Sequence, residues 1–442
     1  MGRSKENGWF FITTEVNEVQ TQNKTKVAEM AENLIGSEII KLGGEIRDLI
    51  AKGNKIFNFT IGDFDPKVFP IPQELKNNII DAYAHDMTNY PPANGLPELR
   101  KAVVHAIKKY QGLAYDAEEI LIAGGARPII YAIFRTVVDP KDKVLFPVPS
   151  WNNNHYTHLT FAQQVFVETK PENKFMPTVE ELLPHMQDAS LLALCSPLNP
   201  TGTVFTKEGL SAICDAVLAE NERRGPDQKP LYVMYDQIYS MLTFDGVQHF
   251  DPVSLRPEMR PYTIFVDGIS KSLAATGVRV GWAFGPMEVI DKMKSILGHV
   301  GAWAPRAEQF ASAQFMNDEN AYERFIDQMN NEVSQRLNGF HSGIQALKDK
   351  GHAVNSIVPE GAIYLTVQFD LKGKTRSNGT AIESTSDITA FLLEEAHLAV
   401  VPFSAFGASS ESTWYRLSVG TATMQNVADA IADLETALKS LK

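Results

Sequence analysis

The decisive stretch is residues 267–282, DGISKSLAATGVRVGW. It follows an apolar, strand-like run and places Lys271 eight residues before Arg279. A lysine amine can condense with an aldehyde, and an arginine can hold a nearby phosphate with two parallel hydrogen bonds. Small residues between them, such as Ser270 and Gly277, leave room for a bulky cofactor. The pattern therefore predicts a covalent cofactor site; the alternative is that Lys271 and Arg279 are solvated surface charges.

Composition limits the class of protein. The 442 residues are enough for two or three domains, and 44% apolar with 21% charged residues fit a soluble globular protein. The formal charge of -12 argues against non-specific binding to nucleic acid or anionic membrane. Two cysteines without metal-type spacing favour a reduced, cytoplasmic protein without a metal site. No apolar run approaches the roughly 18 residues of a membrane span, and no secretory signal is recognisable.

The first 29 residues are polar apart from residues 9–12. We expect either a flexible extension or a translation start at Met30. Their few arginines and several glutamates argue against an organelle transit peptide.

Strand-like and helical segments alternate between residues 119 and 284. Candidate strands are residues 120–123, 144–147, 164–167, 191–195, 231–235, 262–266 and 280–284. Continuous apolar runs separated by helices predict a mainly parallel sheet covered on both faces. Ligands of such sheets gather outside the carboxyl ends of the strands.

The flanking segments predict a second, smaller unit. Residues 30–52 show helical spacing of Ile35, Ile39, Leu42, Ile46 and Leu49, and residues 73–84 predict another helix. About 40 helical residues follow residue 309, then strands near 362–369, 398–403 and 415–419, and a helix over 424–441. We expect a large cofactor-binding domain of residues 62–305 and a small α+β domain of residues 30–61 and 306–442.

A glycine turn lies between the first strand and its helix. Gly124, Gly125 and Ala126 would present backbone N–H groups and the positive end of a helix to an anion. This predicts a phosphate seat, with an ordinary tight turn as the alternative.

The loop after the fourth strand, residues 196–202, reads SPLNPTG. Its prolines stiffen the loop, and the Asn199 amide can donate a hydrogen bond to a bound oxygen. We expect a cis peptide bond before Pro197 or Pro200.

Together these motifs resemble the class I and II aminotransferases of the aspartate aminotransferase superfamily. The resemblance covers roughly residues 33–440, and the motifs occur in the family's order: 62, 90, 124–126, 151, 199–200, 236 and 239, 270–279 and 416. It implies pyridoxal-phosphate-dependent fold type I. That fold has a large α/β domain with a mainly parallel sheet covered by helices, and a smaller α+β domain. It also implies a homodimer with shared active sites.

The resemblance assigns catalytic roles to three residues. Lys271 forms the resting Schiff base and then moves a proton between the substrate α-carbon and the cofactor. Asp236 keeps the pyridine nitrogen protonated, because an opposite charge favours the charged form; capping a helix is the alternative. Tyr239 presents its hydroxyl to the phenolic oxygen alongside Asn199. Lysine is normally protonated near neutral pH, so we expect burial and nearby positive charge to favour its neutral form.

It also assigns cofactor contacts. Gly125, Ala126, Ser270 and Arg279 surround the phosphate, and Tyr90 reaches the phosphate bound by the other subunit of the dimer. Trp151, in the loop after the second strand, stacks on the pyridine ring; a core tryptophan is the alternative.

Substrate contacts follow in the same way. Arg416 holds the substrate α-carboxylate with two parallel hydrogen bonds, with a surface charge as the alternative. A backbone group of Gly62 meets the same carboxylate, unless Gly62 is a plain turn glycine. Trp151 and Asn199 complete the predicted substrate-binding residues.

One departure from the family pattern affects specificity. Many bacterial relatives carry a lysine where Ala126 stands, and that lysine helps to bind an acidic substrate side chain. Here Arg127 follows immediately. Arg127 either takes over recognition of a dicarboxylate or faces solvent.

The resemblance implies an aminotransferase of amino-acid metabolism and biosynthesis. We expect it to move an amino group between an L-amino acid, with aspartate and glutamate favoured, and a 2-oxo acid. A β-eliminating lyase of the same fold and cofactor is an alternative, because both reactions pass through the same carbanion. A non-catalytic relative that binds pyridoxal phosphate or an amino acid as a signal is the alternative from another class.

Overall fold

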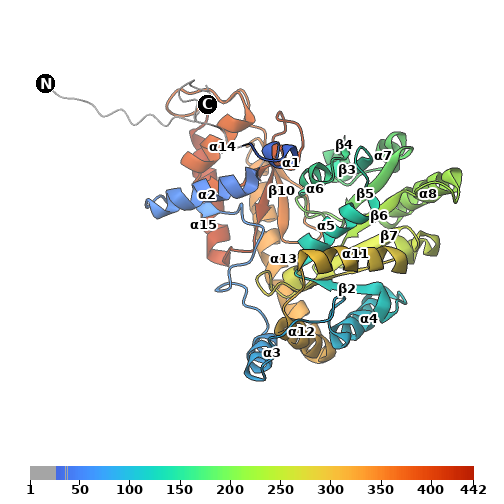
Figure 1. The fold of residues 1–442 in the computed structure, drawn as a ribbon. Coiled ribbons are helices and arrows are strands. Elements are labelled where there is room, and N and C mark those ends of the chain that lie inside the picture. Colours follow the sequence, from blue (N-terminus) through green and yellow to red (C-terminus); the bar gives the residue numbers. More distant parts are fainter. Residues whose placement is uncertain (1–25, 35, 37) are drawn as a thin grey trace. The chain divides into compact units, whose positions relative to one another are not determined.

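The computed structural model describes residues 26–442 apart from 35 and 37, and the chain divides into two compact units, residues 1–34 and 35–442 (Figure 1). The first contains the single turn α1 (Glu29–Glu32), and the second begins with α2 (Glu38–Ala51). The continuous helix expected over residues 30–52 is therefore wrong: α1 ends at Glu32, and the poor helix formers Asn33 and Gly36 lie between the helices. Ile35 and residues 1–25 of the expected extension lie outside the described residues.

A seven-stranded sheet forms the centre of the second unit, in the order β2-β8-β7-β6-β5-β3-β4. The strands are β2 (Ile120–Ala123), β3 (Lys143–Val148), β4 (Gln163–Glu168), β5 (Ala189–Cys195), β6 (Tyr232–Asp236), β7 (Thr263–Gly268) and β8 (Gly281–Phe284). Only β8 runs antiparallel to its neighbours in this sheet. The predicted mainly parallel sheet and all seven of its strands are confirmed.

Helices cover both faces of this sheet, which explains the continuous apolar runs. Ile120 and Ile122 pack on one side with α4 (Pro97–Gln111), α8 (Lys207–Arg224) and α12 (Arg306–Asn317). Leu121 and Ala123 pack on the other with α5 (Ala126–Val137) and α11 (Met287–Val300), which lie side by side in Figure 1. Because side chains alternate along a strand, burial of both faces requires every position to be apolar.

A second core forms around a four-stranded antiparallel sheet, β12-β13-β10-β9. Its strands are β9 (Val354–Ser356), β10 (Tyr364–Phe369), β12 (Val401–Pro402) and β13 (Trp414–Ser418), packed against α13 (Glu319–Asp349), α14 (Thr385–Glu394) and α15 (Met424–Ser440). The strand expected over 398–403 is two short strands, because β11 (Leu398–Ala399) pairs instead with β1 (Phe57–Asn58). The long helix after residue 309 is interrupted at Asp318, whose carboxylate accepts a hydrogen bond from Ala321 N at 3.1 Å and caps α13.

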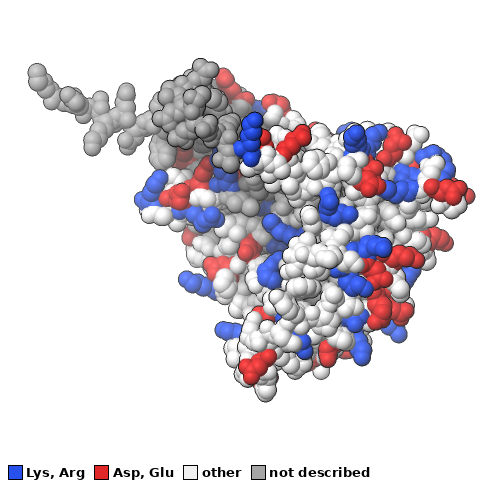
Figure 2. Space-filling model, viewed as in Figure 1, with Lys and Arg blue, Asp and Glu red and all other residues white. Residues whose placement is uncertain are grey.

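The other helices are α3 (Gln73–Ala84), α6 (Asn153–Leu159), α7 (Val179–Met186), α9 (Pro252–Leu255) and α10 (Ile269–Ser272). Across the described residues, no helix combines the length and apolar character needed to span a membrane. Acidic and basic side chains are interspersed over the face shown in Figure 2.

Candidate functional site

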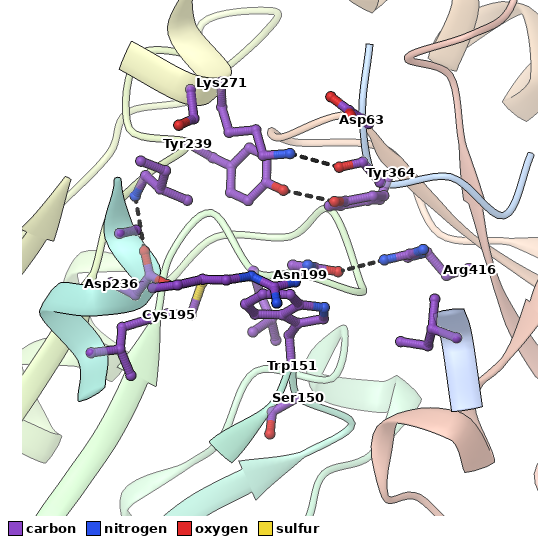
Figure 3. A pocket seen from close by; sticks show the side chains of 18 of the residues that line it. Asp63, Ser150, Trp151, Cys195, Asn199, Asp236, Tyr239, Lys271, Tyr364 and Arg416 are labelled. Atoms are coloured by element: carbon purple, nitrogen blue, oxygen red, sulfur yellow. Dashed lines mark hydrogen bonds between the residues drawn. The ribbon is translucent and has the colours of Figure 1, made fainter. Parts of the chain in front are cut away.

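A cavity of about 590 Å³ opens at the carboxyl ends of β5, β6 and β7. In-register pairing sets Cys195 beside Asp236, and Asp236 beside Val266, so three strands end at one edge. Eleven predicted site residues line this cavity: Gly62, Ala126, Arg127, Trp151, Asn199, Asp236, Tyr239, Ser270, Lys271, Arg279 and Arg416. Figure 3 labels Trp151, Asn199, Asp236, Tyr239, Lys271 and Arg416 among them. Segments distant in sequence thus meet where parallel-sheet topology predicts a ligand.

Lys271 lies on the single turn α10, directly after β7. Its Nζ donates a 2.6 Å hydrogen bond to the Gly62 carbonyl oxygen. Burial lowers the pKa of Lys271 to about 8; Asp63 opposes this shift, and the guanidinium groups of Arg416 and Arg127 add to it. The neutral amine is therefore more accessible than in an ordinary lysine, the direction that nucleophilic or basic chemistry needs.

Asp236 ends β6 within the cavity. Oδ1 accepts a 3.1 Å hydrogen bond from Ile238 N, and burial raises the pKa of this carboxyl to about 6. Its other oxygen receives no hydrogen bond from a described residue. A cationic partner in the cavity would lower this pKa again and stabilise the ionised form.

The expected phosphate seat is built around Arg279. Its Nη2 donates to the Gly124 carbonyl at 2.8 Å, and its Nη1 donates to the Thr276 carbonyl at 2.6 Å. Gly125 has φ +93°, and a Cβ there would lie 2.2 Å from Arg279 Nη2. Only glycine lets the first turn of α5 and this guanidinium come so close. Ser270 is buried and also lines the cavity.

Three glycines tie this seat to the lysine. A Cβ on Gly268 would lie 2.8 Å from Gly281 Cα, and a Cβ on Gly281 would lie 2.7 Å from the Gly125 carbonyl carbon. The end of β7, the start of β8 and the turn before α5 therefore touch through bare backbone.

Arg416 joins the small sheet to the loop of Asn199. The arginine is 1% exposed; Nη1 donates to Asn199 Oδ1 at 3.0 Å, and Nη2 donates to the Thr60 carbonyl at 2.6 Å (Figure 3). Arginine only donates, so the contact assigns the Asn199 oxygen to this side and leaves its NH₂ group available to a ligand. Both peptide bonds proposed to be cis, Ser196–Pro197 and Asn199–Pro200, are cis.

Two aromatic contacts complete the lining. The hydroxyls of Tyr239 and Tyr364 lie 2.7 Å apart (Figure 3). Trp151 is half-buried, and the Arg127 Cζ lies 4.6 Å from its ring centroid, an attractive cation–π arrangement. Arg127 is exposed and makes no ion pair with a described residue.

Tyr90 does not join the other predicted residues. It is 79% exposed and packs edge-on against Trp303, with ring centroids 5.1 Å apart, in a separate groove. Gly125 lies just behind the lining, next to Ala126.

Sequence reasoning missed several lining residues, among them Asp63, Ser150, Tyr364 and Arg47. Asp63 follows Gly62, and Ser150 precedes Trp151, so adjacency was an available signal. Tyr364 lies in an apolar strand where it is indistinguishable from a core aromatic. Arg47 lies on a polar stretch of α2 that is typical of a solvated face.

Comparison with known proteins agrees with this geometry. The family model for aminotransferase class I and II matches residues 54–434. The aspartate aminotransferase of Bacillus sp. (strain YM-2) is 28% identical over 418 residues, covering 94% of this chain and all of that protein. A probable aspartate/prephenate aminotransferase of Rhizobium leguminosarum bv. phaseoli is 30% identical, covering 88% of this chain and 93% of that protein. The crystal structure of the Rhizobium meliloti aspartate aminotransferase superposes with a TM-score of 0.86 at 27% identity, covering 95% of this chain and all of that one.

The match runs through both cores and every segment that lines the cavity except α2, which precedes it. The chain therefore belongs to the class I and II aminotransferase family and is a pyridoxal-phosphate-dependent aminotransferase with the type I fold.

Proposed function

We propose that this aminotransferase passes the amino group of an acidic L-amino acid, aspartate or glutamate, to a 2-oxo acid. The observation that carries the proposal is the charge of the cavity. Its lining holds five basic side chains, Arg47, Arg127, Lys271, Arg279 and Arg416, against two acidic ones, Asp63 and Asp236. A protein with a formal charge of -12 thus concentrates positive charge where its substrate binds. The similarity to proteins named aspartate aminotransferases supports the same substrate class.

The residues present fit the cofactor. Gly125 lets the Arg279 guanidinium lie against the turn before α5, where it would meet a phosphate; Ser270 adds a hydroxyl, and Asp236 retains an oxygen for a pyridine nitrogen. When bound, pyridoxal phosphate supplies the aldehyde with which Lys271 condenses and a ring that withdraws electrons from the substrate α-carbon.

The chain's own groups have distinct tasks in this proposal. Lys271 Nζ, neutral above pH ~8, would take the proton from the substrate α-carbon and deliver it to the exocyclic carbon of the bound cofactor. Tyr239 and the Asn199 amide would donate to the phenolic oxygen, and Trp151 would stack on the ring. Arg416 binds the α-carboxylate with the help of a Gly62 backbone group.

We also propose a homodimer in which Tyr90 reaches the partner's phosphate seat. Tyr90 projects from a groove that includes Trp303 and Arg306, and Arg306 Nη1 donates to the Tyr90 carbonyl at 3.3 Å. The groove lies close to the seat of its own chain, because Gly124 N donates at 2.9 Å to the carbonyl of Ala302, the residue before Trp303. This closeness supports a dimer in which the groove of one protomer lies beside the seat of its partner.

We propose a domain of residues 62–305 that holds the cofactor and a smaller domain of residues 30–61 with 306–442. Separate apolar clusters around the two sheets support a division into two cores, although α12, from the proposed smaller domain, packs in the cluster of the large sheet. A cytoplasmic location is proposed from the free thiols of Cys195 and Cys214.

The first experiment is the visible absorption spectrum of the purified protein with single amino acids and no oxo acid. We expect glutamate or aspartate to convert the lysine-bound cofactor stoichiometrically to its amine form. Accumulation of ammonia and pyruvate with an unchanged spectrum would instead favour a β-eliminating lyase. A protein that binds no chromophore after addition of pyridoxal phosphate would contradict the proposed role of Lys271.

A further inference from the structure

A pair of polar side chains lies on the face of the large sheet opposite the cavity. Gln237 directly follows β6 and is 0% exposed, and Asp267 lies at the end of β7, shortly before Lys271. Neither side chain lines the cavity. Because side chains alternate along a strand, both lie on the side where Tyr235 and Phe265 pack. The sheet therefore separates this pair from the site.

A hydrogen bond joins the two side chains. Gln237 Nε2 donates to Asp267 Oδ2 at 3.1 Å, and Gly268 N donates to the other carboxylate oxygen, Oδ1, at 2.7 Å. The paired register of β6 and β7 ends at Asp236 and Val266. This side-chain bridge continues the connection between the two strands past that point, into the turn before α10.

His249 orients the amide of this bridge. Its Nε2 lies 3.5 Å from Gln237 Oε1, and its ring centroid is 6.0 Å from that of Tyr235. Burial lowers the pKa of His249 to about 4, so the imidazole is neutral near pH ~7. An amide oxygen only accepts, so the contact assigns the imidazole proton to Nε2 and directs the NH₂ group of Gln237 to Asp267.

The Asp267 carboxylate depends on its two donors. Burial raises its pKa to about 7; hydrogen bonds from Gly268 N and Gln237 oppose this shift, and the Asp236 carboxylate adds to it. Tyr322 also faces this carboxyl group. The bridge is strongest above pH ~7, because a hydrogen bond to an ionised acceptor is roughly twice as strong as a neutral one.

We propose that Gln237 and Asp267 are positioning residues that set the spacing between Asp236 and Lys271 from the far side of the sheet. The inference rests on the roles proposed above for Asp236 and Lys271. In those roles the two side chains hold opposite ends of one rigid aromatic ring, the pyridine nitrogen and the carbon that carries the aldehyde. A rigid ring satisfies both contacts only if the two strand ends keep one separation, to within about 0.5 Å.

The test compares two forms of the cofactor. Pyridoxal phosphate engages both ends, through its ring nitrogen and through its covalent bond to Lys271. Pyridoxamine phosphate carries an amine in place of the aldehyde and engages only the nitrogen end. Their dissociation constants are measured by fluorescence titration of the cofactor-free wild type, Q237E, D267N and Q237E/D267N at pH ~8, where the Asp267 carboxylate is ionised.

These variants keep the size of each side chain and change only the pairing. Q237E sets two carboxyl groups against each other, and D267N sets two amides against each other. The double variant restores one amide and one carboxylate with donor and acceptor exchanged, and it still offers an amide oxygen to Gly268 N and a carboxylate oxygen to His249.

Asn221 provides the matched control. It is buried outside the cavity, and its amide group bonds the backbone of Leu231 through both its nitrogen and its oxygen. N221D therefore also introduces a buried carboxylate, at a distance from the bridge. It should lower the melting temperature without changing the ratio of the two dissociation constants.

We expect Q237E to weaken binding of pyridoxal phosphate by at least ~10-fold and that of pyridoxamine phosphate by less than ~3-fold. The double variant should return to within ~3-fold of wild type. The absorption maximum of the lysine-bound cofactor should shift in Q237E and return in the double variant. D267N adds no charge and gives the same comparison should Q237E not fold; its preference for pyridoxal phosphate should fall by at least ~3-fold.

Equal losses for both cofactor forms, or a double variant no better than Q237E, would overturn the bridge as a positioning device and leave the proposed function standing. A wild type that forms no covalent bond with pyridoxal phosphate would refute the proposed role of Lys271 and the inference with it.

Discussion

Arg416 and Asn199 lie 217 residues apart in the chain, yet Nη1 of the first donates a 3.0 Å hydrogen bond to Oδ1 of the second. The bond connects β13 to the loop after β5, and both side chains are buried. Under the proposed function, the group that would bind the substrate carboxylate is thereby coupled to the group that would face the cofactor. The orientation of the Asn199 amide depends on the presence of the arginine.

Replacing Arg416 with lysine should therefore affect two steps. An ammonium group cannot make the paired hydrogen bonds of a guanidinium, so KM for the amino acid should rise by ~10- to 100-fold. The released Asn199 amide should also shift the absorption maximum of the bound cofactor. Steady-state kinetics and spectra of R416K test both effects.

Arg224 provides the control. It is also buried and donates to the carbonyls of Met186 and Ala189, but it lies outside the cavity. R224K should lower the melting temperature and leave KM unchanged. An equal rise of KM in both variants would show that loss of any buried arginine disturbs the protein.

The lowered pKa of Lys271 predicts how cofactor-free protein takes up pyridoxal phosphate. Only the neutral amine condenses with an aldehyde, so the rate constant should rise with pH and level off above about 8, well below the 10.5 of an ordinary lysine. Stopped-flow absorbance over pH ~6 to ~10 measures the profile. K271A should form no covalent band and lose turnover by at least ~10³-fold. A midpoint near 10 would contradict the burial argument.

Replacing Asp236 should stabilise the cofactor-free protein but reduce the activity of the enzyme. Burial raises its pKa from 3.8 to about 6, so its contribution to stability is present below pH 3.8 and is lost as pH rises through 6. D236N removes the buried charge and should stabilise the cofactor-free protein by about 1–3 kcal/mol at pH ~7, with little effect at pH ~4. Turnover should fall by ~10²-fold or more, because the pyridine nitrogen loses its anionic partner. Urea unfolding at the two pH values measures the first effect; a D236N protein that is less stable at both would refute it.

Much of the fold was predictable because apolar runs and periodicity are local signals. The seven strands of the large sheet were found because helices on both faces require every strand position to be apolar. Element boundaries set by single polar residues were missed, as at Asp318, whose side chain ends one helix and caps the next. Division of residues 398–403 between two sheets depends on pairing with Phe57, a long-range contact that local sequence does not encode.

The geometry of the phosphate seat predicts that alanine at Gly125 weakens cofactor binding, whereas alanine at Gly277 does not. G125A places a Cβ 2.2 Å from Arg279 Nη2 at φ +93°, so it should weaken pyridoxal phosphate binding by at least ~10-fold. G277A, in the same lysine-to-arginine segment, has no heavy atom within 4 Å of its Cβ and should bind normally. Fluorescence titration of the cofactor-free variants compares them. Equal affinities would show that the close approach of Gly125 and Arg279 does not govern binding.

The close approach of Gly62 and Tyr364 predicts that a substitution of Tyr364 can partly restore the activity lost by a substitution of Gly62. A Cβ on Gly62 would lie 2.8 Å from the Tyr364 hydroxyl oxygen, which is 2.7 Å from that of Tyr239. G62A should therefore lower kcat, and Y364F, which removes the obstructing oxygen, should recover part of the loss in the double variant. Additive losses in the double-mutant cycle would mean that Gly62 acts through its backbone alone.

The site was predicted where motif residues directly follow strands, as for Asp236 and Lys271. Tyr364 and Arg47 could not be predicted in this way. The first lies within the small sheet, and the second reaches the cavity only because α2 packs across it on Ile39 and Leu42. Their positions are a product of tertiary packing.

The contact of Gly268, Gly281 and Gly125 through bare backbone makes the lysine turn and the phosphate seat one mechanical unit. Any side chain at these positions would push the lysine turn away from the phosphate seat, so a substitution at one glycine should disturb both. Helix α2 lies outside that unit and joins the cavity through a few side chains. Changes on α2 can therefore reshape one wall of the cavity without moving the lysine relative to the phosphate seat.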